Sequence, residues 1–545
     1  MLNLITDNLD VWASAELPAK TGGRGRAASN TKSPHGIQKL RELILELAVR
    51  GKLVPQNAEW KPCRLGELGR WAVGSGFPTA EQGLSGLEIL FVKVSDMNLP
   101  ENTKFIFTSN HTISRETAGR LRVNIHPEGT VVFPKIGGAI ATNKRRILSV
   151  PTAIDNNCLG IAPRDGVSTE WLYTLLTSID FTQYQAGTSV PALAQGVLEE
   201  IDVLLPPLAE QHRIVAKVDE LMALCDRLEQ EQTDNSNAHQ TLVETLLATL
   251  TQAEGGGDFA VAWQRIAAYF DALFTTEQSI DQLKQTILQL AVMGKLVSQD
   301  PSDEPASELL KRIHAEKAKL IAEGKIKKDK PLPPITEDEK PFELPQGWEW
   351  VRLDEVANLI TKGSSPKWQG VSYTENPDDV MFVTSENVGS YRLLLDSPKY
   401  VEKKFNDIEP RSILVTGDFL MNIVGASIGR TAIYNLGTLA NINQAVCLIR
   451  ISNSNLSRMF LLHFFNSATC LEYMFDKQVE NARPNLSMGN IAKFLIPIPP
   501  VEEQHRIVAK VDELMALCDA LKARLNEAQT TQVQLADAVV EQAVG

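Results

Sequence analysis

The run EQHRIVAKVDELMALCD occupies Glu210–Asp226 and recurs without a change at Glu503–Asp519, 293 residues further along the chain. Identity over such a length is far beyond chance. The spacing is also too long for a solenoid, whose units run roughly 20–50 residues. The sequence therefore predicts two duplicated halves, each as large as a domain. Because this run is preserved more strictly than anything else, we expect it to hold two related surfaces at a set distance.

A second repeated segment shows where the halves differ. Leu40–Val54 matches Leu283–Val297, but here the offset is only 243 residues, so the second half must contain about 50 extra residues, and these lie in 300–345. Inside the halves the similarity is weak. Gly74–Pro78 aligns with Lys362–Pro366, and 137–140 aligns with 424–427. The two domains are expected to share the same backbone fold and to differ in their surface residues.

Length and composition restrict the class of protein. A chain of 545 residues is too long for a single core, and 43% hydrophobic with 22% charged residues is ordinary for a globular protein. No stretch approaches the roughly 20 apolar residues that span a bilayer, and the acidic Asp7 and Asp10 interrupt any signal peptide. We expect a cytoplasmic protein without a membrane segment. The six cysteines form no C-x-x-C pair, and Cys225 and Cys518 are interpreted as core residues.

The repeated helix carries a heptad pattern. Its apolar positions are Ile214, Val218, Leu221 and Cys225 in the first copy and Ile507, Val511, Leu514 and Cys518 in the second. Each copy follows a Pro-Pro pair, which is a strong helix start signal. We call each set of apolar positions a seam, and we expect the two seams to pack against each other as an antiparallel coiled coil. The alternative is that each helix packs only on its own domain.

This helix could serve as a ruler. The stretch 209–231 would be about 35 Å long, close to the roughly 34 Å of one turn of B-DNA. The sequence Asp234–Asn237 predicts a break before a second helical stretch that ends near Leu250. The glycine run in 254–258 then predicts a flexible joint. Inserting four residues after Cys225 is expected to widen the distance that such a ruler sets.

The remaining segments predict mixed α/β (α+β) domains. Short β-branched runs such as 130–133 and 449–451 alternate with helical stretches such as 171–177 and 459–466. The predicted organisation is a flexible segment 1–34, a conserved helix 35–57, a first domain 58–205, a spacer helix region 206–254, a helical region 255–299, an amphipathic helix with a basic Pro-rich linker 300–345, a second domain 346–498 and a C-terminal spacer helix 499–545.

The net charge of −13 argues against strong DNA binding by the whole surface, so local basic clusters matter more. In the near-neutral first domain the candidates for DNA contact are Lys144, Arg145, Arg146, Asn143, Arg120 and Arg122. The alternative for the triplet at 144–146 is an exposed charged turn. In the second domain the candidates are Lys362, Ser364, Lys367, Trp368, Arg430 and Arg483. A partner is expected to supply part of the phosphate contact.

No catalytic motif is present in the sequence. Gly425–Thr431 resembles a phosphate loop, but it is one spacer residue short and carries Arg430 in place of lysine. There is no Asn-Pro-Pro-aromatic motif of adenine methyltransferases and no glycine-rich cofactor loop after a strand. His212 and His505 are interpreted as helix-end or packing residues. The chain is thus predicted to be a binding scaffold with no catalytic residue, metal or cofactor of its own.

These motifs together resemble the specificity subunit of type I restriction–modification systems. The resemblance rests on PPLAEQHRIVAKVDEL and PPVEEQHRIVAKVDEL, on RELILELAVRGKLV before the first domain, and on ASELLKRIHAEKAKLIAEGKIKKDKPLPP before the second. It covers essentially the whole chain. It implies that each domain is a target-recognition domain that reads one half of a split, asymmetric DNA sequence, with the helices as spacer.

The resemblance also implies partners: double-stranded DNA, two methyltransferase subunits with S-adenosylmethionine, and two translocase–nuclease subunits that use ATP and Mg²⁺. A DNA-modifying enzyme is disfavoured because its motifs are missing. A coiled-coil adaptor that never touches DNA is the other alternative, and it gives no reason for two domains with one frame and different surfaces.

Overall fold

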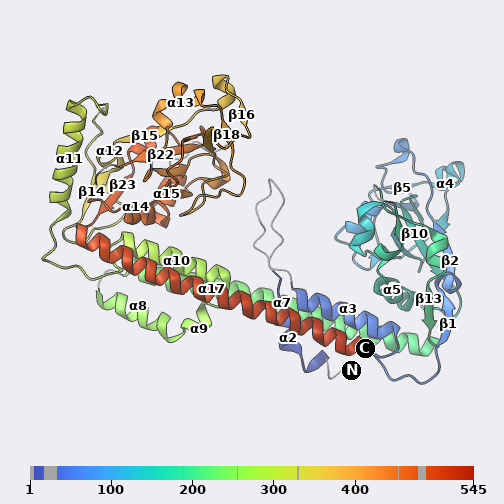
Figure 1. The fold of residues 1–545 in the computed structure, drawn as a ribbon. Helices are drawn as coiled ribbons and strands as arrows, with labels where there is room; N and C mark the ends of the chain where they lie inside the picture. Colours follow the sequence, from blue (N-terminus) through green and yellow to red (C-terminus); the bar gives the residue numbers. More distant parts are fainter. Residues whose placement is uncertain are drawn as a thin grey trace. The chain divides into compact units, whose positions relative to one another are not determined.

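The computed structural model describes residues 5–17, 34–187, 190–253, 256–327, 331–451, 453, 455–476 and 486–544. The chain forms two compact units (Figure 1). Unit 1 comprises Met1–Asn237 with Asn526–Gly545, and unit 2 comprises Ala238–Leu525. The chain passes between the units inside two long helices, α7 (Leu208–Gln252) and α17 (Val501–Val544). Each long helix therefore contributes its first part to one unit and its last part to the other.

In unit 1 the long helices pack around α3 (His35–Val49), with α2 (Leu9–Ser14) beside them. Arg41 of α3 bonds Asp226 at 2.8 Å, whereas Gln232 donates to the carbonyl of Ala13, next to the start of α3, at 3.0 Å. The α7 helix thus runs antiparallel to α3. The end of α17 runs parallel to α3, because Asp537 contacts His35 at the start of α3 and the carbonyl of Val544 accepts from the Arg50 side chain just after its end. Within this unit α7 and α17 are antiparallel.

Unit 2 repeats the arrangement around α10 (Glu277–Val292). Gln282 donates to Glu244 at 2.8 Å and Lys295 donates to the carbonyl of Thr251 at 2.7 Å, so α10 runs parallel to the end of α7. Lys522 meets Asp281 at 3.1 Å, which places the start of α17 antiparallel to both. The helices α8 (Gly256–Ala268), α9 (Phe270–Leu273) and α11 (Ala306–Ala322) complete the helical part of this unit.

The two long helices pack antiparallel within each unit, as expected, but their seams do not pack against each other. Ile214, Val218, Leu221 and Cys225 share a buried cluster with Leu40, Ile44 and Leu47 of α3. Ile507, Val511 and Cys518 belong to a different cluster, with Leu283 and Ile287 of α10, and Leu514 packs against it. The two seams lie near helix starts, so an antiparallel pairing brings each seam to the other helix's far end. Cys225 and Cys518 are core residues, as predicted.

The far ends of α7 and α17 contain the matching positions that the sequence reading missed. Val243, Leu247 and Leu250 of α7 belong to the unit 2 cluster, and Ala536, Val540 and Ala543 of α17 pack in the unit 1 cluster. These triplets are 293 residues apart, the offset of the identical run. The duplication therefore extends through both helices, although no residue identity marks it at these positions.

The predicted break in α7 is also wrong. The helix is continuous over 45 residues, which corresponds to about 68 Å rather than 35 Å. Asp234 and its polar neighbours are exposed, and Gln230 donates to Asp234 one turn later at 2.9 Å. Exposed Asn, Asp and Ser weaken a helix but do not stop it when the flanking turns are packed. The predicted flexible joint at the glycine run is also shorter than expected, because α8 begins at Gly256.

The first α/β domain contains two main sheets. One has the order β2 (Gly69–Val73), β10 (Cys158–Pro163), β7 (Val131–Pro134), β8 (Arg146–Leu148), β4 (Phe105–Ile106). The other has the order β5 (Thr112–Ile113), β3 (Ile89–Val92), β9 (Thr152–Ile154), β6 (Ile125–His126). β1 (Lys61–Arg64) pairs with β13 (Asp202–Leu205) where the domain meets the helices, and β11 (Gln185–Ala186) pairs with β12 (Ala192–Leu193). The helices are α4 (Arg115–Leu121), α5 (Thr169–Ser178) and α6 (Gln195–Glu199).

The second α/β domain follows the same plan. Its sheets have the orders β15 (Leu359–Lys362), β22 (Val446–Arg450), β19 (Phe419–Asn422), β20 (Thr431–Ile433), and β16 (Tyr373–Thr374), β18 (Tyr400–Val401), β17 (Val380–Val383), β21 (Ala440–Ile442). β14 (Glu349–Arg352) pairs with β23 (Leu495–Ile498). The helices are α12 (Leu353–Val356), α13 (Lys404–Ile408), α14 (Arg458–Phe465), α15 (Ala468–Asp476) and α16 (Met488–Ala492).

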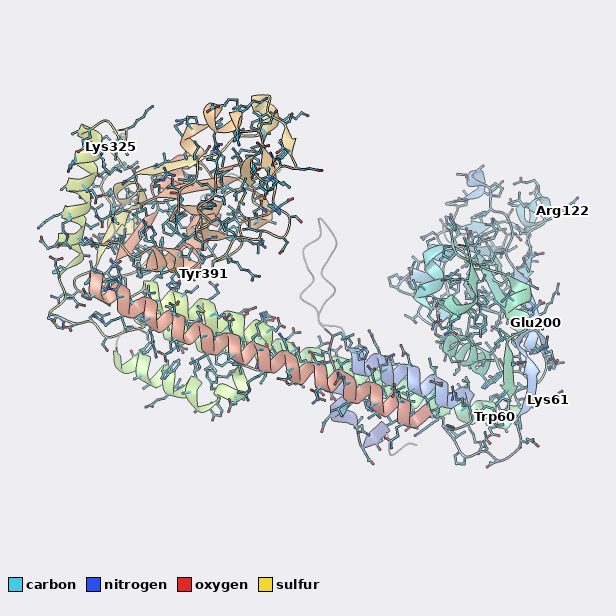
Figure 2. All side chains as sticks on the ribbon, in the orientation of Figure 1. Trp60, Lys61, Arg122, Glu200, Lys325 and Tyr391 are labelled. Carbon is cyan, nitrogen blue, oxygen red and sulfur yellow. The ribbon has the colours of Figure 1, made fainter. Side chains whose placement is uncertain are left out.

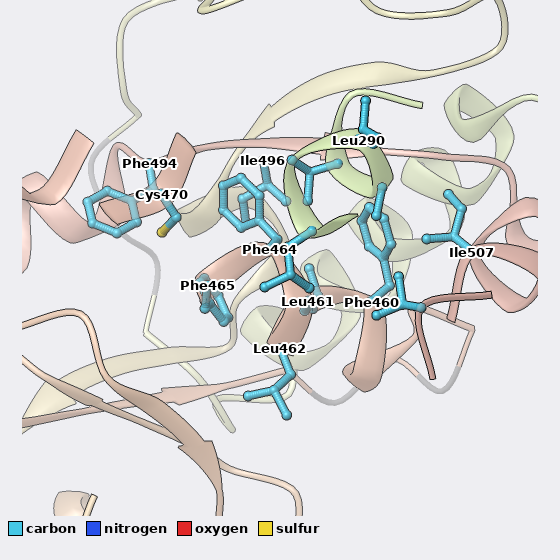
Figure 3. Packing of buried hydrophobic residues seen from close by; sticks show 14 of the residues in the cluster. Leu290, Phe460, Leu461, Leu462, Phe464, Phe465, Cys470, Phe494, Ile496 and Ile507 are labelled. Atoms are coloured by element: carbon cyan, nitrogen blue, oxygen red, sulfur yellow. The ribbon is translucent and has the colours of Figure 1, made fainter. Parts of the chain in front are cut away.

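The core of unit 2 joins this domain to its helices. Phe460 and Phe464 of α14 lie among Leu290 of α10, Ile507 of α17 and Ile496 of β23 (Figure 3). The aromatic side chains are fully or almost fully buried, and each such side chain contributes about 1.5–3 kcal/mol on burial. The mixed α/β prediction is confirmed in both domains. Among the described residues no helix combines the length and apolar character that crossing a bilayer requires.

The equivalent glycines of the two domains lie one residue away from the positions that the sequence alignment predicted. Gly74 directly follows β2 and Gly363 directly follows β15, so these two residues are equivalent rather than Gly74 and Lys362. In the same way Gly137 matches Gly425, because both follow an extended residue and both have φ of 76°. The earlier alignment was shifted by one residue at both turns.

Candidate nucleic-acid interface

Several loops leave one edge of the main sheet in each α/β domain. In the first domain Val73 pairs with Leu159 and Pro134 pairs with Cys158, so β2 and β7 end where β10 begins. The parallel strands β3 and β9 end beside them. We call the four segments that follow or precede these strands the loop edge. In the first domain it comprises 74–82, 93–98, 135–144 and 155–157, and in the second it comprises 363–370, 384–389, 423–430 and 443–445.

The loop edge of the first domain is a continuous surface. Ser75 N donates to the carbonyl of Ile154 at 2.8 Å, and Lys135 N donates to the carbonyl of Asn157 at 2.8 Å. Lys93 Nζ bonds Gln82 Oε1 at 3.0 Å, and Lys144 Nζ bonds Asn98. Backbone and side-chain contacts thus tie all four segments together.

The second domain ties its loop edge together with equivalent contacts. Asn443 N donates to the carbonyl of Val383 at 3.0 Å, and Ile423 N donates to the carbonyl of Ala445 at 3.0 Å. The buried Asn422 uses its Nδ2 to bond the carbonyls of Ser385 and Val388 at 3.0 and 3.1 Å. Loops held in this way lose little conformational entropy when a ligand binds.

Charge at the loop edge favours an anionic ligand. In the first domain Asp96 and Asp155 are buried in turns, and Glu81 forms an ion pair with Arg120. In the second domain Glu386 pairs with Lys399 at 2.8 Å. The negative groups are therefore buried or neutralised, while several lysines and arginines remain at the surface.

The predicted basic triplet divides into different environments. Arg145 was expected to face DNA, but it is only 2% exposed, which corrects that expectation. Its guanidinium lies 4.1 Å from the ring centroid of Phe181 and donates to the carbonyl of Leu176 at 3.0 Å. Burial lowers the pKa of Arg145 to about 9. The residue holds β8 to α5 and cannot reach a phosphate.

The neighbours of Arg145 are more accessible. Arg146 is half-buried, donates to the carbonyl of Met97 at 2.9 Å, and has its pKa lowered by burial. Asn143 is exposed in the left-handed conformation, and its Nδ2 bonds the carbonyl of Thr177 at 2.8 Å. Lys144 lies at the end of the loop edge and is the member of the triplet best placed for phosphate contact.

The other first-domain candidates lie on and just after α4. Arg120 is exposed and pairs with Glu81 of the loop edge. Arg122 is exposed at the left-handed cap that ends the helix, at the outer end of α4 (Figure 2). Both residues remain available to a ligand that extends beyond the four loops.

The second-domain candidates gather on the loop edge or at its border. Trp368 is 74% exposed in the short turn Pro366–Gln369, beside the exposed Lys367. Ser364 Oγ accepts from Gln369 Nε2 at 3.0 Å. Lys362 and Arg430 are exposed at the ends of the two adjacent segments, whereas Arg483 lies outside the described residues.

The repeated run also contains the residues that attach each domain to its helix. Gln211 Oε1 accepts from Ser168 N at 2.7 Å, and Gln211 Nε2 donates to the carbonyl of Pro206 at 2.9 Å. Gln504 makes the same pair of bonds to Ser457 and Pro499 at 2.8 and 2.9 Å. Both glutamine side chains are fully buried. Sequence reasoning missed this role, although the identity of the run was the signal.

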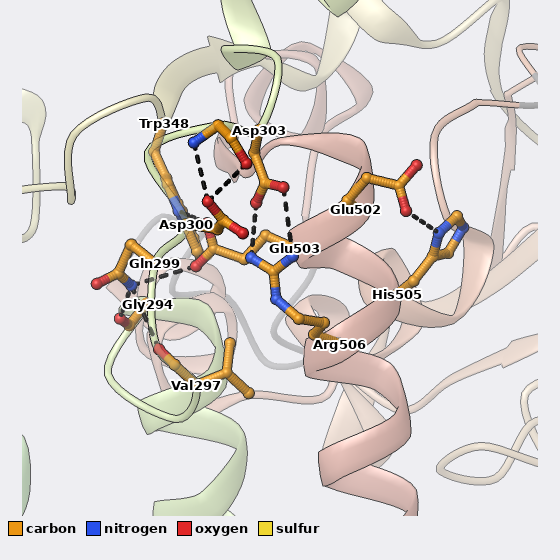
Figure 4. A network of polar contacts seen from close by, with 11 residues as sticks. Gly294, Val297, Gln299, Asp300, Asp303, Trp348, Glu502, Glu503, His505 and Arg506 are labelled. Carbon is orange, nitrogen blue, oxygen red and sulfur yellow. Dashed lines mark hydrogen bonds and ion pairs between the residues drawn. The ribbon is translucent and has the colours of Figure 1, made fainter.

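A carboxylate next to Gln504 completes the attachment in unit 2 (Figure 4). Glu503 accepts from Trp348 Nε1 at 3.0 Å and from Gln299 at 3.2 Å, and burial raises its pKa. Arg506 pairs with Asp303 at 2.6 Å. The duplicated histidines take no part, because His212 and His505 are exposed, so the packing part of their interpretation is wrong.

Within the described ranges, no group of three His, Cys, Asp or Glu side chains could hold a metal ion. What the arrangement offers is two similar polar edges, one in each unit, with half-exposed lysines in the first domain and exposed cations in the second. Such surfaces bind and position a polyanion.

Comparisons with known proteins agree with this architecture. The family described as "Type I restriction modification DNA specificity domain" matches residues 57–236 and 345–530. The EcoEI and EcoAI type I restriction enzyme specificity subunits of Escherichia coli are each 34% identical to the chain, over 99% of both sequences. A solved structure on complex assembly and conformational transition of the type I R-M system covers 90% of this chain and 99% of its own, with a TM-score of 0.50. Its identity is 20%, so it shows the fold alone.

Proposed function

Since the chain belongs to the family of type I restriction–modification DNA specificity subunits, we propose that each of its α/β domains, with bounds near 58–205 and 346–498, reads one half of a split DNA target through its loop edge. This assignment is supported by the contrast between the attachment of the domains to their helices, which is the same in both units, and the residues of the loops, which differ. The attachment through Gln211 and Gln504 is identical in the two units, whereas the loop residues differ. Two different surfaces on one frame fit an asymmetric target.

The phosphate contacts are assigned to cations around these loops. In the first domain Lys144 is the main candidate. Arg120, Arg122 and the half-buried Arg146 are the others. In the second domain Lys362, Lys367 and Arg430 take this role, and Trp368 offers an exposed aromatic face. Arg483 stays a prediction. Half or more of protein–DNA hydrogen bonds go to phosphate and sugar, so such residues fix register without reading sequence.

The identical run supports two copies of one protein partner. His212, Ala216, Asp219 and Ala223 lie on one exposed face of α7, since they are spaced by three or four residues. His505, Ala509, Asp512 and Ala516 form the same face on α17. We call each face the repeated stripe. These exposed alanines belong to no buried core, so their identity in both copies indicates that the same surface is recognised twice.

We assign the repeated stripes to two methyltransferase subunits that carry S-adenosylmethionine. Two ATP- and Mg²⁺-dependent translocase–nuclease subunits would complete the assembly. In this scheme the chain supplies the sequence reading and the scaffold, its partners supply the chemistry, and the complex acts on DNA in the cytoplasm.

The test is to co-express the full chain with its methyltransferase partner and to sequence the methylome. The expected result is a bipartite, asymmetric motif. Replacing residues 60–205 with the matching domain of a relative should change one half of the motif and leave the other. A change in both halves would refute the proposal that each domain reads one half of the target. A complex that binds no duplex would instead favour a coiled-coil adaptor that does not contact DNA.

A further inference from the structure

One turn at the centre of each loop edge presents an unbonded amide side chain at its tip. In the first domain Asp155 Oδ1 accepts from the backbone of Asn157 at 3.1 Å, so Asn156 lies at the tip of an Asx turn. In the second domain Asn443 Oδ1 accepts from the backbone of Ala445 at 3.0 Å, which places Gln444 at the equivalent tip. We call Asn156 and Gln444 the tip residues.

Neighbouring loops hold each turn in place. Asp155 N donates to the carbonyl of Val92 at 2.9 Å and Asn443 N donates to that of Val383 at 3.0 Å. A glycine packs closely against each turn or the end of the strand leading into it. A Cβ on Gly74 would lie 1.8 Å from the Asp155 carbonyl oxygen, and one on Gly363 would lie 1.8 Å from that of Ile442. Both tips are therefore rigid.

The side chains of the tip residues are free to bind a ligand. Asn156 is exposed and Gln444 is half-buried, and within the described part of the chain neither amide has a hydrogen-bond partner. This distinguishes them from the buried or bonded amides nearby, such as Asn422 and Asn98. An unpaired amide on a rigid turn at the centre of a polar edge is preorganised for recognition.

From these observations we infer that Asn156 and Gln444 are specificity-determining residues that each contact an adenine, in the half-site read by their own domain. The inference rests on the proposed function and extends it to single side chains. Asparagine and glutamine present one donor and one acceptor in the geometry that matches adenine N6 and N7. The two domains differ at the next position, where Asn157 corresponds to Ala445, but both keep an amide at the tip.

The experiment uses the full chain in complex with its methyltransferase partner. The wild-type methylome first defines the two half-sites. Competition binding then compares duplexes in which each base pair is replaced in turn. Asn156→Ala should lower the preference for A·T at one position of one half-site by about ten- to a hundredfold, with other positions unchanged. Gln444→Ala should do the same in the other half-site.

Two further variants keep the test independent of folding. Asn156→Asp preserves the shape of the side chain but replaces the donor with an acceptor, so the same preference should be lost. Asn156→Gln keeps the amide and should retain a preference for adenine. The matched control is Asn235→Ala, which removes an exposed amide from α7, outside both loop edges, and should leave all preferences intact.

Three results would overturn the inference. They are an equal loss of affinity for every duplex, unchanged preferences in Asn156→Ala and Asn156→Asp, or a lost preference for a base other than adenine. The first would make the tip residue a phosphate contact only. A wild-type complex that recognises no split target would instead refute the proposed function itself.

Discussion

Lys144, Arg145 and Arg146 are consecutive in the sequence, yet their charged groups meet different surroundings. Arg145 lies between Phe133 and Phe181 and bonds backbone carbonyls, whereas Lys144 lies on the loop edge. Replacing Lys144 with alanine should reduce the slope of log affinity against log salt by about 0.9. Replacing Arg145 with alanine should leave that slope unchanged and lower the free energy of unfolding by about 1–3 kcal/mol, because buried carbonyls lose their donor. Salt titrations of DNA binding and chemical denaturation measure the two effects. An unchanged salt slope in Lys144→Ala together with a reduced slope in Arg145→Ala would contradict these two roles.

His463 of α14 gives a pH-dependent prediction. Its side chain is buried, with Nδ1 3.1 Å from the Tyr391 hydroxyl and Nε2 4.0 Å from the Asp512 carboxylate. Burial lowers the pKa of His463 to about 4, despite the opposing effect of Asp512. The unfolded chain protonates first, near its ordinary value of about 6.5, so the stability present above that pH is lost as the pH falls through 4.

We therefore expect wild-type unit 2 to lose about 2 kcal/mol of unfolding free energy between pH 7.5 and pH 5 through this residue. His463→Gln should flatten the dependence, as measured by denaturant titration at several pH values. Ala520→Gln, at an exposed position of α17, provides the control, since it removes no titratable group and should leave the dependence unchanged. Parallel curves for wild type and His463→Gln would show that the buried imidazole does not titrate in this range.

Each of the two long helices belongs to one unit in its first part and to the other unit in its last part. An insertion after Cys225 would fall among contacts of unit 1, because the next residue, Asp226, bonds Arg41. A better site is the exposed stretch after Ser236, with a matching insertion after Gln529, 293 residues later. If these helices set the unread gap, four residues in each should add about 6 Å, or nearly two base pairs.

The methylome of such a double insertion should show the same half-sites with a wider gap. Two-residue insertions provide the comparison, because about 200° of rotation would turn the packed faces of Val243 and Ala536 away from their clusters and lower stability. An unchanged gap with full activity would show that the partner subunits, and not these helices, determine the spacing.

At the scale of the whole molecule, the repeated stripes predict a stoichiometry. Ala216→Arg or Ala509→Arg alone should leave one methyltransferase copy bound per chain, and both together should leave none, because each arginine adds bulk and charge to an exposed face. Native mass spectrometry of the co-expressed complex counts the copies. Ala267→Arg, at an exposed alanine of α8, is the matched control. Two copies bound to the double variant would place the docking surface elsewhere.

Sequence patterns alone were enough for several features. The identical run revealed the duplication and the first part of each long helix, and β-branched runs such as 130–133 predicted strands because their chemistry is local. The second-domain candidates Lys367, Trp368 and Arg430 did gather around one set of loops. Glycine and proline turns mark loop positions through their own backbone preferences, so these placements needed no knowledge of distant residues.

Other features depended on which distant segments meet. The seam at Ile214 packs on α3, the burial of Arg145 follows from α5 and Phe181, and the tips at Asn156 and Gln444 become central only when four loops share one sheet edge. A heptad pattern specifies an apolar face but not its partner, and a run of cations specifies charge but not exposure. Local residue patterns were sufficient to find the duplication, many of the strands and the family. Tertiary structure decided partners and accessibility, because burial and hydrogen bonding are set by residues far away in the chain.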